Sequence, residues 1–397
     1  MIKRVYVKNY RSLAEVEVNL DRLTVLVGQN GAGKSNFIDV LRFISDSMRK
    51  GLETAIDERQ GIKALRRWAP RRPYDIEIEI DIEQENLIGR YRIEIKSVKS
   101  EPEIYVSYNI KREKCNCILD NKVSTYEIYN GGWIKKPDLG KGQLIFKFNE
   151  KKEEKIDIKD ILPNLDKKKL ILPSIALYPF GELHSYLRNM NFYNIYPNEI
   201  RQPREASIEY PLDLHGKNIA SVLKRMQRDK SKYLNNVKEA LAQIVPGIID
   251  IEVKPVAGFL TLKFIHKYED NKEHDFDASQ ESDGTLRVLG ILVALFQEPP
   301  PFLLAIEEPE LTVHPGVLPI LADLVKEAAE KRTQVIITTH SPDLISQFNP
   351  NDIRIVDWNY QDGTTIGPVE ESQIEIINEK LFSAGDLLRI EGLRKDL

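Results

Sequence analysis

Cysteine is nearly absent from this chain. The 397 residues include two, Cys115 and Cys117, which stand two positions apart in a segment that alternates like a strand. Side chains at this spacing point to the same face of a strand, a poor arrangement for a disulfide, and no pair of histidines is near to complete a zinc site. The sequence shows neither a disulfide framework nor a zinc finger, and we expect a cytoplasmic protein.

Long apolar runs and a large net charge are missing as well. No apolar stretch approaches the roughly 20 residues needed to span a bilayer, and the opening residues MIKRVYVKNY alternate like a strand instead of forming the apolar region of a signal peptide. The net charge is −4, from 57 basic and 61 acidic residues. We therefore expect a soluble protein with no membrane partner and no general affinity for nucleic acid, although a local basic patch is compatible with this composition.

The order of patterned segments predicts a mixed α/β protein. Residues 74–83 and 89–98 alternate apolar and polar side chains, which is typical of an antiparallel sheet with one wet face. Residues 23–27 favour a buried strand and residues 217–244 a helical stretch, and from Thr285 onward helices and strands alternate, which favours a mainly parallel core. We expect an N-terminal lobe over residues 1–170, a mainly helical insertion over 171–248 and a C-terminal lobe over 249–397.

A phosphate-binding motif follows the strand at residues 23–27. The segment GQNGAGKS, Gly28 to Ser35, matches G-x-x-x-x-G-K-[ST] at every fixed position and opens a helix. Its glycines let backbone N–H groups surround phosphate oxygens, Lys34 brings a positive charge to the β- and γ-phosphates, and the Ser35 hydroxyl is placed to ligate Mg²⁺. A glycine-rich turn with a chance lysine is the alternative, which both the spacing and the context oppose. The predicted ATP-binding residues are Gly28, Asn30, Gly31, Gly33, Lys34, Ser35 and Asn36.

Two later strands end in groups suited to hydrolysis. The segment PFLLAIEEPE places Glu307 and Glu308 at the end of a buried strand, and QVIITTHSP places His340 at the end of another. At the carboxyl edge of a parallel sheet, Glu307 would orient Mg²⁺ together with Ser35, Glu308 would polarise the attacking water, and His340 would contact the γ-phosphate. Solvated loop acids and a structural histidine are the alternatives. The order of phosphate loop, acidic pair and histidine favours a catalytic set of Glu308, His340 and Glu307.

The segment SDGTLRVLGILVALFQ, residues 282–297, begins with small and acidic residues and continues as an apolar stretch of helical length. An ordinary N-cap at Ser282 explains this pattern. A second interpretation is that the helix N-terminus serves a nucleotide, because helix N-termini attract phosphate.

Together these segments resemble the ABC-type ATPase heads of the SMC/RecF/OLD group, and more closely the small bacterial AAA family ATPases of the AAA_21 type. The resemblance rests on KNYRSL at residues 8–13, GQNGAGKSN at 28–36, SDGTLR at 282–287, AIEEPELTVHP at 305–315 and TTHSP at 338–342. It implies a P-loop NTPase fold with a mainly parallel core sheet, an antiparallel β lobe and a helical insertion. It also implies Mg²⁺ with ATP as the cofactor.

The same resemblance implies a homodimer around ATP, in which the signature-like loop of one chain meets the nucleotide of the other. That loop would consist of Ser282, Asp283, Gly284 and Thr285, and Arg11 resembles a residue that approaches the nucleotide. Asp283 stands where the family usually has glycine and Glu307 where transporters have aspartate, and no Q-loop glutamine is identifiable.

Three functions remain for such a head. The first is an ATP-hydrolysing molecular switch, the ATPase component of a bacterial defence or toxin-type system that acts with a separately encoded effector. The second is a RecF-like ATPase of DNA repair or recombination, for which the arginines and tryptophan of RRWAPRR at residues 66–72 would supply phosphate contact and stacking; a solvated loop with a buried Trp68 is the alternative. The third, a transporter subunit, is disfavoured by SDGT and by KNYRS. Long coiled-coil arms and a Toprim nuclease domain are not expected.

Overall fold

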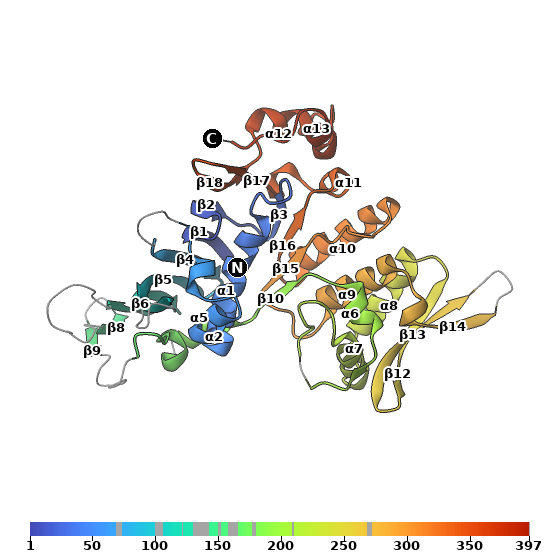
Figure 1. Cartoon of the computed structure of the whole chain (residues 1–397), viewed down its shortest axis with the longest axis horizontal. Helices are drawn as coiled ribbons and strands as arrows, with labels where there is room; N and C mark the ends of the chain where they lie inside the picture. Colours follow the sequence, from blue (N-terminus) through green and yellow to red (C-terminus); the bar gives the residue numbers. More distant parts are fainter. Residues whose placement is uncertain are drawn as a thin grey trace. The chain divides into compact units, whose positions relative to one another are not determined.

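The structure is a computed structural model of the chain. It describes residues 1–68, 74–99, 106–120, 122–129, 143–149, 152–157, 166–176, 180–208, 210–267 and 272–396. The chain divides into two compact units, and each is built from separate stretches of sequence (Figure 1). Unit 1 comprises Met1–Asp21, Gln29–Met190 and Val356–Gly367, and unit 2 comprises Arg22–Gly28, Asn191–Ile355 and Pro368–Leu397.

Unit 1 contains an antiparallel sheet with the strand order β18-β2-β1-β4-β5-β6-β7-β8-β9. In β4, IEIEIDIEQ, the isoleucines are buried and the acidic residues point outward over most of the strand, as alternation predicts. The strands are β1 (Ile2–Tyr10), β2 (Leu13–Asn19), β4 (Ile76–Gln84), β5 (Leu87–Lys99), β6 (Val106–Leu119), β7 (Lys122–Tyr129), β8 (Gln143–Asn149), β9 (Lys152–Asp157) and β18 (Gly363–Pro368).

The helices of unit 1 cover the apolar face of this sheet. The long helix α1 (Lys34–Lys50) is amphipathic, and its buried side chains include Phe37, Val40 and Phe43. It packs against α2 (Leu52–Asp57) and α5 (Phe180–Arg188). The short elements are α3 (Ile62–Leu65) and the 3₁₀ turn η1 (Leu172–Ile175).

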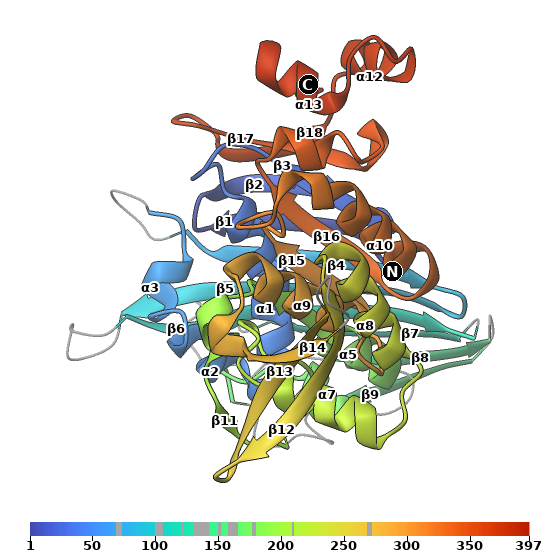
Figure 2. The ribbon, with the colours of Figure 1, turned by 90° about the vertical axis from the view of Figure 1, so that its right-hand side faces the viewer.

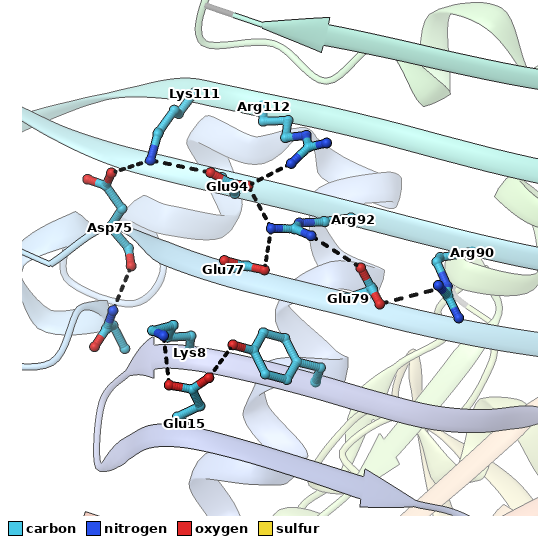
Figure 3. Close-up of polar contacts among 12 residues, drawn as sticks. Lys8, Glu15, Asp75, Glu77, Glu79, Arg90, Arg92, Glu94, Lys111 and Arg112 are labelled. Carbon is cyan, nitrogen blue, oxygen red and sulfur yellow. Dashed lines mark hydrogen bonds and ion pairs between the residues drawn. The ribbon is translucent and has the colours of Figure 1, made fainter. Parts of the chain in front are cut away.

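The opposite, polar face of the sheet carries a network of ion pairs (Figure 3). Arg92 Nη2 lies 2.7 Å from Glu77 Oε1 and 3.0 Å from Glu94 Oε1. Lys111 Nζ lies 3.0 Å from Asp75 Oδ2 and 3.4 Å from Glu94 Oε2. Because neighbouring side chains of opposite charge on a sheet compensate one another, these basic side chains are already matched by carboxylates of the same face.

Unit 2 contains a sheet in the order β10-β15-β16-β3-β17, in which β15, β16, β3 and β17 run parallel. Its strands are β10 (Met190–Tyr193), β15 (Leu303–Glu307), β16 (Gln334–Thr339), β3 (Leu23–Val27) and β17 (Ile353–Asn359), of which β17 continues into unit 1. Figure 2 shows α9 (Asp283–Phe296) and α10 (Leu318–Lys331) beside these strands. All of α9 from Thr285 onward is buried, as its apolar sequence predicts.

A second, smaller sheet in unit 2 has the order β11-β13-β12, and β14 also pairs with β13. Its strands are β11 (Arg204–Glu205), β12 (Ile248–Val256), β13 (Phe259–Lys267) and β14 (Glu273–Asp277). The remaining helices and 3₁₀ turns are α6 (Pro197–Arg201), α7 (Ile219–Arg228), α8 (Tyr233–Ile244), η2 (Ala278–Gln280), η3 (Pro315–Val317), α11 (Pro342–Ile345), η4 (Pro350–Asp352), α12 (Glu371–Asn378) and α13 (Ala384–Ile390). Within the described ranges, no helix has both the length and the apolar character to cross a membrane.

Candidate nucleotide site

The glycine-rich loop of unit 1 ends where α1 begins. Gly33 is the N-cap of α1 and has φ 112°, a conformation that side chains disfavour. A Cβ at this position would lie 2.2 Å from Thr364 Oγ1, so glycine is required for space as well. Thr364 is buried and donates its hydroxyl to the carbonyl of Ala32. Ser12 Oγ lies 2.7 Å from Thr364 Oγ1 and accepts a bond from Asn36 Nδ2. The loop therefore has a defined shape supported by two hydroxyl side chains.

Lys34 and Ser35, the two side chains of the phosphate motif expected to contact the nucleotide and Mg²⁺, differ in their exposure to solvent. Lys34 is buried, and its Nζ donates to the carbonyl of Gln29 at 3.2 Å within the same loop. Ser35 is exposed on the first turn of α1. The Lys34 side chain therefore links the two ends of the phosphate loop, to which it would also add positive charge. The Ser35 hydroxyl is accessible to a ligand.

Arg11 lies against α1 and not in the loop. It has a positive φ of 47°, and its Nη2 lies 3.0 Å from Asp39 Oδ2. Asp39 also accepts bonds from Tyr10 Oη at 2.7 Å and from Arg59 Nε at 2.9 Å. The guanidinium of Arg11 is thus attached to the second turn of the helix that begins at Lys34, with its side chain 32% exposed.

Three parallel strands of unit 2 end at the same edge of the sheet. Pairing of Val27 with Thr339 and of Glu307 with Thr338 aligns β3, β16 and β15. Gly28 directly follows β3, Glu307 ends β15, and His340 directly follows β16. The first residue of the phosphate motif, the acidic pair and the histidine therefore share one carboxyl edge.

Glu308 has an unusual backbone conformation at this edge. Its φ is 45°, which is uncommon for a residue other than glycine. Its N–H donates to Thr338 O at 3.0 Å and to Thr338 Oγ1 at 3.2 Å, and these bonds hold the turn after β15. The side chain points toward His340, with 2.6 Å between Glu308 Oε2 and His340 Nδ1. This geometry brings together two of the residues that the sequence predicts to be catalytic.

Glu310 is a third member of this group that the sequence-based prediction missed. Its Oε1 accepts bonds from Thr339 Oγ1 and from His340 N, whereas the buried Oε2 has no donor. Burial, with Glu308 as the next cause, raises the pKa of the Glu310 carboxyl to about 7. The sequence signal was present, because Glu310 is the last acid of EEPE. Pro309 separates it from Glu308, and the pattern alone did not show that it turns back toward β16.

Glu308, Glu310 and His340 each offer one ligand atom, and these atoms lie within 4.8 Å of one another. Among the described residues, Glu307 is not part of this group. It is the half-buried last residue of β15. The acidic segment therefore separates into Glu307 at the strand end and a cluster of Glu308, Glu310 and His340 beyond it.

The SDGT segment forms the start of α9. Ser282 is its N-cap, with its Oγ accepting from Thr285 N at 3.1 Å, so the ordinary cap is present. Ser282 and Asp283 are exposed, and Asp283 Oδ1 lies 2.7 Å from Arg201 Nη2. A Cβ on Gly284 would lie 2.6 Å from Thr312 O, so this turn packs closely against the segment that follows the acidic group.

One turn later, Arg287 links α9 to the acidic segment. Its side chain is buried, and its Nη1 donates to the carbonyl of Glu308 at 3.4 Å. Burial lowers the pKa of the Arg287 guanidinium, with the nearby carboxylates opposing that shift. The helix that begins at the SDGT segment is therefore in direct contact with the backbone of the predicted catalytic glutamate.

Comparisons with known proteins bear on the family and on the fold. The family model described as "AAA domain, putative AbiEii toxin, Type IV TA system" matches residues 23–346. No curated protein matches the chain.

Among solved structures, an SMC head bound to the C-winged helix domain of ScpA has a TM-score of 0.50 at 14% identity, covering 94% of this chain and 99% of that chain. The SMC head domain from Thermotoga maritima has a TM-score of 0.42 at 13% identity, covering 93% and 99%. The Pyrococcus furiosus Smc head domain with an extended coiled coil, bound to the C-terminal domain of ScpA, has 0.46 at 13% identity, covering 96% and 99%. At such identities the likeness concerns the fold. The predicted α/β fold of an ABC-type ATPase head is confirmed.

Proposed function

The chain belongs to this AAA-domain family, and from this premise we propose that it is a Mg²⁺-dependent ATPase that acts as a molecular switch. The observation that carries the proposal is the shared carboxyl edge of β3, β16 and β15. β3 continues into the phosphate motif, β15 ends at Glu307 with Glu308 directly after it, and His340 directly follows β16. This is where ligands bind in open α/β sheets.

The proposed roles follow from the chemistry of each group. Lys34 would neutralise charge on the transferred phosphate, and the Glu308 carboxylate, oriented by His340 Nδ1, would accept a proton from the attacking water. The Ser35 hydroxyl and the Glu307 carboxylate offer the oxygen donors that Mg²⁺ prefers. When bound, Mg²⁺ would supply charge neutralisation on the phosphate oxygens.

A homodimer is part of the proposal, because Ser282 and Asp283 are exposed at the N-terminus of α9. A helix N-terminus attracts phosphate, and in the ABC-type arrangement this end serves the nucleotide of a second chain. The contact of Arg287 with the Glu308 carbonyl would connect the state of that loop to the catalytic glutamate of the same chain.

Glu308→Gln tests catalysis. The amide cannot accept the proton, so we expect turnover to fall by a factor of about 100 or more while ATP binding is retained. The trapped state is a dimer, measurable by light scattering with saturating ATP. Normal hydrolysis, or a variant that stays monomeric with ATP, would contradict the proposal.

Ser282→Arg tests the dimer separately. We expect ATP binding to persist, because the residue lies outside the phosphate loop, and hydrolysis to stop. Ser279→Arg is the matched control, since Ser279 is also exposed, three residues earlier in η2. Equal rates of ATP hydrolysis in Ser282→Arg and Ser279→Arg would show that SDGT is only an ordinary helix cap.

The output of the switch is proposed from the family description, which names a putative toxin of a type IV toxin–antitoxin system. We infer that the chain is the ATPase component of a bacterial defence or toxin-type system and acts on a separately encoded effector. The ATP-trapped Glu308→Gln form is the bait for its partner, and the wild-type chain with ADP is the control. Partner capture that does not depend on ATP would contradict a nucleotide-controlled switch.

A RecF-like, DNA-binding ATPase is the second candidate, and one observation on unit 1 favours it. Trp68 is 81% exposed, which makes the alternative of a buried tryptophan wrong. Tyr360 is 90% exposed and packs against Trp358 with ring centroids 4.7 Å apart. Arg67, which precedes Trp68, donates to Asp362 O at 3.5 Å in the turn after these two rings. Exposed aromatics beside arginine suit stacking on bases.

DNA binding is tested with Trp68→Ala and Tyr360→Ala, measured by fluorescence anisotropy on single- and double-stranded oligonucleotides with ATP. Loss of one stacked ring should weaken binding by about 5- to 100-fold, and the affinity of the wild type should fall steeply with salt. Ile88→Ala, at another exposed apolar position of unit 1, is the control. No binding at low salt would exclude this function. Arg71 and Arg72 of the same motif lie outside the described residues.

A further inference from the structure

The cluster of Glu308, Glu310 and His340 has features that ATP hydrolysis alone does not explain. Glu308 Oε2 and Glu310 Oε1 lie 2.6 Å and 3.8 Å from the same ring nitrogen, His340 Nδ1. The Glu310 side chain is 7% exposed, so bulk water cannot solvate its charge. Two carboxylates this close repel one another in a buried environment. The buried Arg287 guanidinium interacts electrostatically with both carboxylates and offsets part of their charge, together with the single imidazole of the cluster.

The second oxygen of Glu310 provides an independent observation. Glu310 Oε1 receives the Thr339 hydroxyl and the His340 N–H, whereas Oε2 is buried without a donor. A buried carboxylate oxygen without a partner costs free energy. A cation is the natural partner for such an atom, because the neighbouring side chains of the cluster are a second carboxylate and an imidazole.

We propose that Glu308, Glu310 and His340 form a divalent-cation site that binds its ion without nucleotide. This site is separate from the Ser35 and Glu307 oxygens assigned to Mg²⁺. One imidazole nitrogen and two carboxylates favour an ion of the Mn²⁺ or Zn²⁺ class, since Mg²⁺ prefers oxygen ligands and retains its waters. The proposal goes beyond ATP hydrolysis and does not depend on it.

The geometry suits such an ion after small side-chain movements. Ligands about 2.1 Å from an octahedral ion are about 3 Å apart. Glu308 Oε2 and Glu310 Oε1 lie 2.6 Å and 3.8 Å from His340 Nδ1, and the three ligand atoms of the cluster lie within 4.8 Å of one another. The imidazole side is open, with His340 43% exposed, so water can fill the remaining positions. On the buried side, the Thr339 hydroxyl orients Glu310, as partners of metal ligands commonly do.

The site has a consequence for regulation. An ion held by Glu308 and His340 would occupy the two groups proposed to act on water and on the γ-phosphate. We therefore expect bound Mn²⁺ or Zn²⁺ to slow hydrolysis that Mg²⁺ supports.

The test is Mn²⁺ binding to the full chain without nucleotide, followed by electron paramagnetic resonance, with Zn²⁺ added as competitor. We expect one Mn²⁺ site per chain in the wild type, displaced by Zn²⁺. Glu310→Gln and His340→Ala should each weaken Mn²⁺ by at least about 10-fold. His340 is exposed, so His340→Ala keeps the core intact.

Two control variants separate this proposal from the proposed ATPase function. Glu307→Gln should keep Mn²⁺ binding, because Glu307 lies outside the cluster. Lys34→Ala should lose ATP but keep Mn²⁺. Equal Mn²⁺ affinity in wild type and Glu310→Gln would overturn the proposal, as would loss of binding in Glu307→Gln or no binding by the wild type. None of these results alters the expected effect of Glu308→Gln on turnover.

Discussion

Two buried glutamates, one in each unit, differ in how fully their oxygens are satisfied. Glu113 on β6 is 1% exposed, and Glu310 beyond β15 is 8% exposed. Burial raises the pKa of both carboxyls. Glu113 accepts four bonds, from Tyr91 Oη, Tyr126 Oη, Ile171 N and Leu172 N, at 2.8 to 3.2 Å.

Glu310, by contrast, has donors on one oxygen alone and a second carboxylate beside it. A buried carboxylate that is saturated with donors has no capacity left for a ligand, and its effect is to connect η1 to the sheet. One with an unsatisfied oxygen costs stability unless something else binds there. The difference separates a structural glutamate from one that we propose to bind a cation, although burial alone makes the two look alike.

The largest effect that this comparison predicts is for Glu113→Gln. In the glutamine variant the amide nitrogen would meet the Ile171 N–H or the donors on the other oxygen, so at least one buried donor loses its acceptor. We expect a loss of about 2–3 kcal/mol of stability, seen as a lower midpoint of urea unfolding and faster proteolysis near residues 170–172.

The control is Glu15→Gln on the polar face of the sheet in Figure 3, where Glu15 pairs with Lys8 and both side chains are largely exposed. Such partly exposed pairs contribute about 0–1 kcal/mol. Similar losses of stability in Glu113→Gln and in the control variant would show that the four hydrogen bonds to Glu113 contribute no more to folding than a partly exposed ion pair does.

An intermediate effect is expected for Thr339→Val. This nearly isosteric change removes the hydroxyl that donates to Glu310 Oε1 and that accepts from Ser341 N at 3.0 Å. Loss of these buried bonds should cost about 1–2 kcal/mol and should weaken Mn²⁺ binding. Thr338→Val is the matched control, since Glu308 N keeps its bond to Thr338 O at 3.0 Å. If Thr338→Val lowered stability and Mn²⁺ affinity more than Thr339→Val does, the Thr339 hydroxyl would not be the group that positions Glu310.

Local patterns predicted much of the fold and pointed to Glu308 and His340, two of the three residues that cluster beyond β15. Patterns that depend only on neighbouring residues placed several elements where the structure has them. They are the alternating strands β4 and β5, the apolar strand β3, and the strand ends at Glu307 and Thr339. The phosphate motif was predicted to open a helix, and α1 begins inside that motif at Lys34, because the glycine-rich loop has a specific backbone requirement.

Features that depend on tertiary contacts were not predictable. The helical pattern of residues 217–244 is interrupted between α7 and α8, where Lys230 has a φ of 51° and Ser231 donates its hydroxyl to Glu298, far away in sequence. The contact of Thr364 with Gly33 joins residues more than three hundred positions apart. The part played by Glu310 depends on β16 lying beside β15, which no single segment encodes.

The smallest effect, and the one opposite in sign, is expected for Glu310→Gln. In metal-free buffer the amide removes the repulsion with Glu308 and can donate to its carboxylate, so stability should be unchanged or raised by about 1 kcal/mol. Mn²⁺ should raise the unfolding temperature of the wild type but not of the variant, because a ligand stabilises the state that binds it. A loss as large as that of Glu113→Gln, with or without Mn²⁺, would mean that the two buried glutamates have the same structural role.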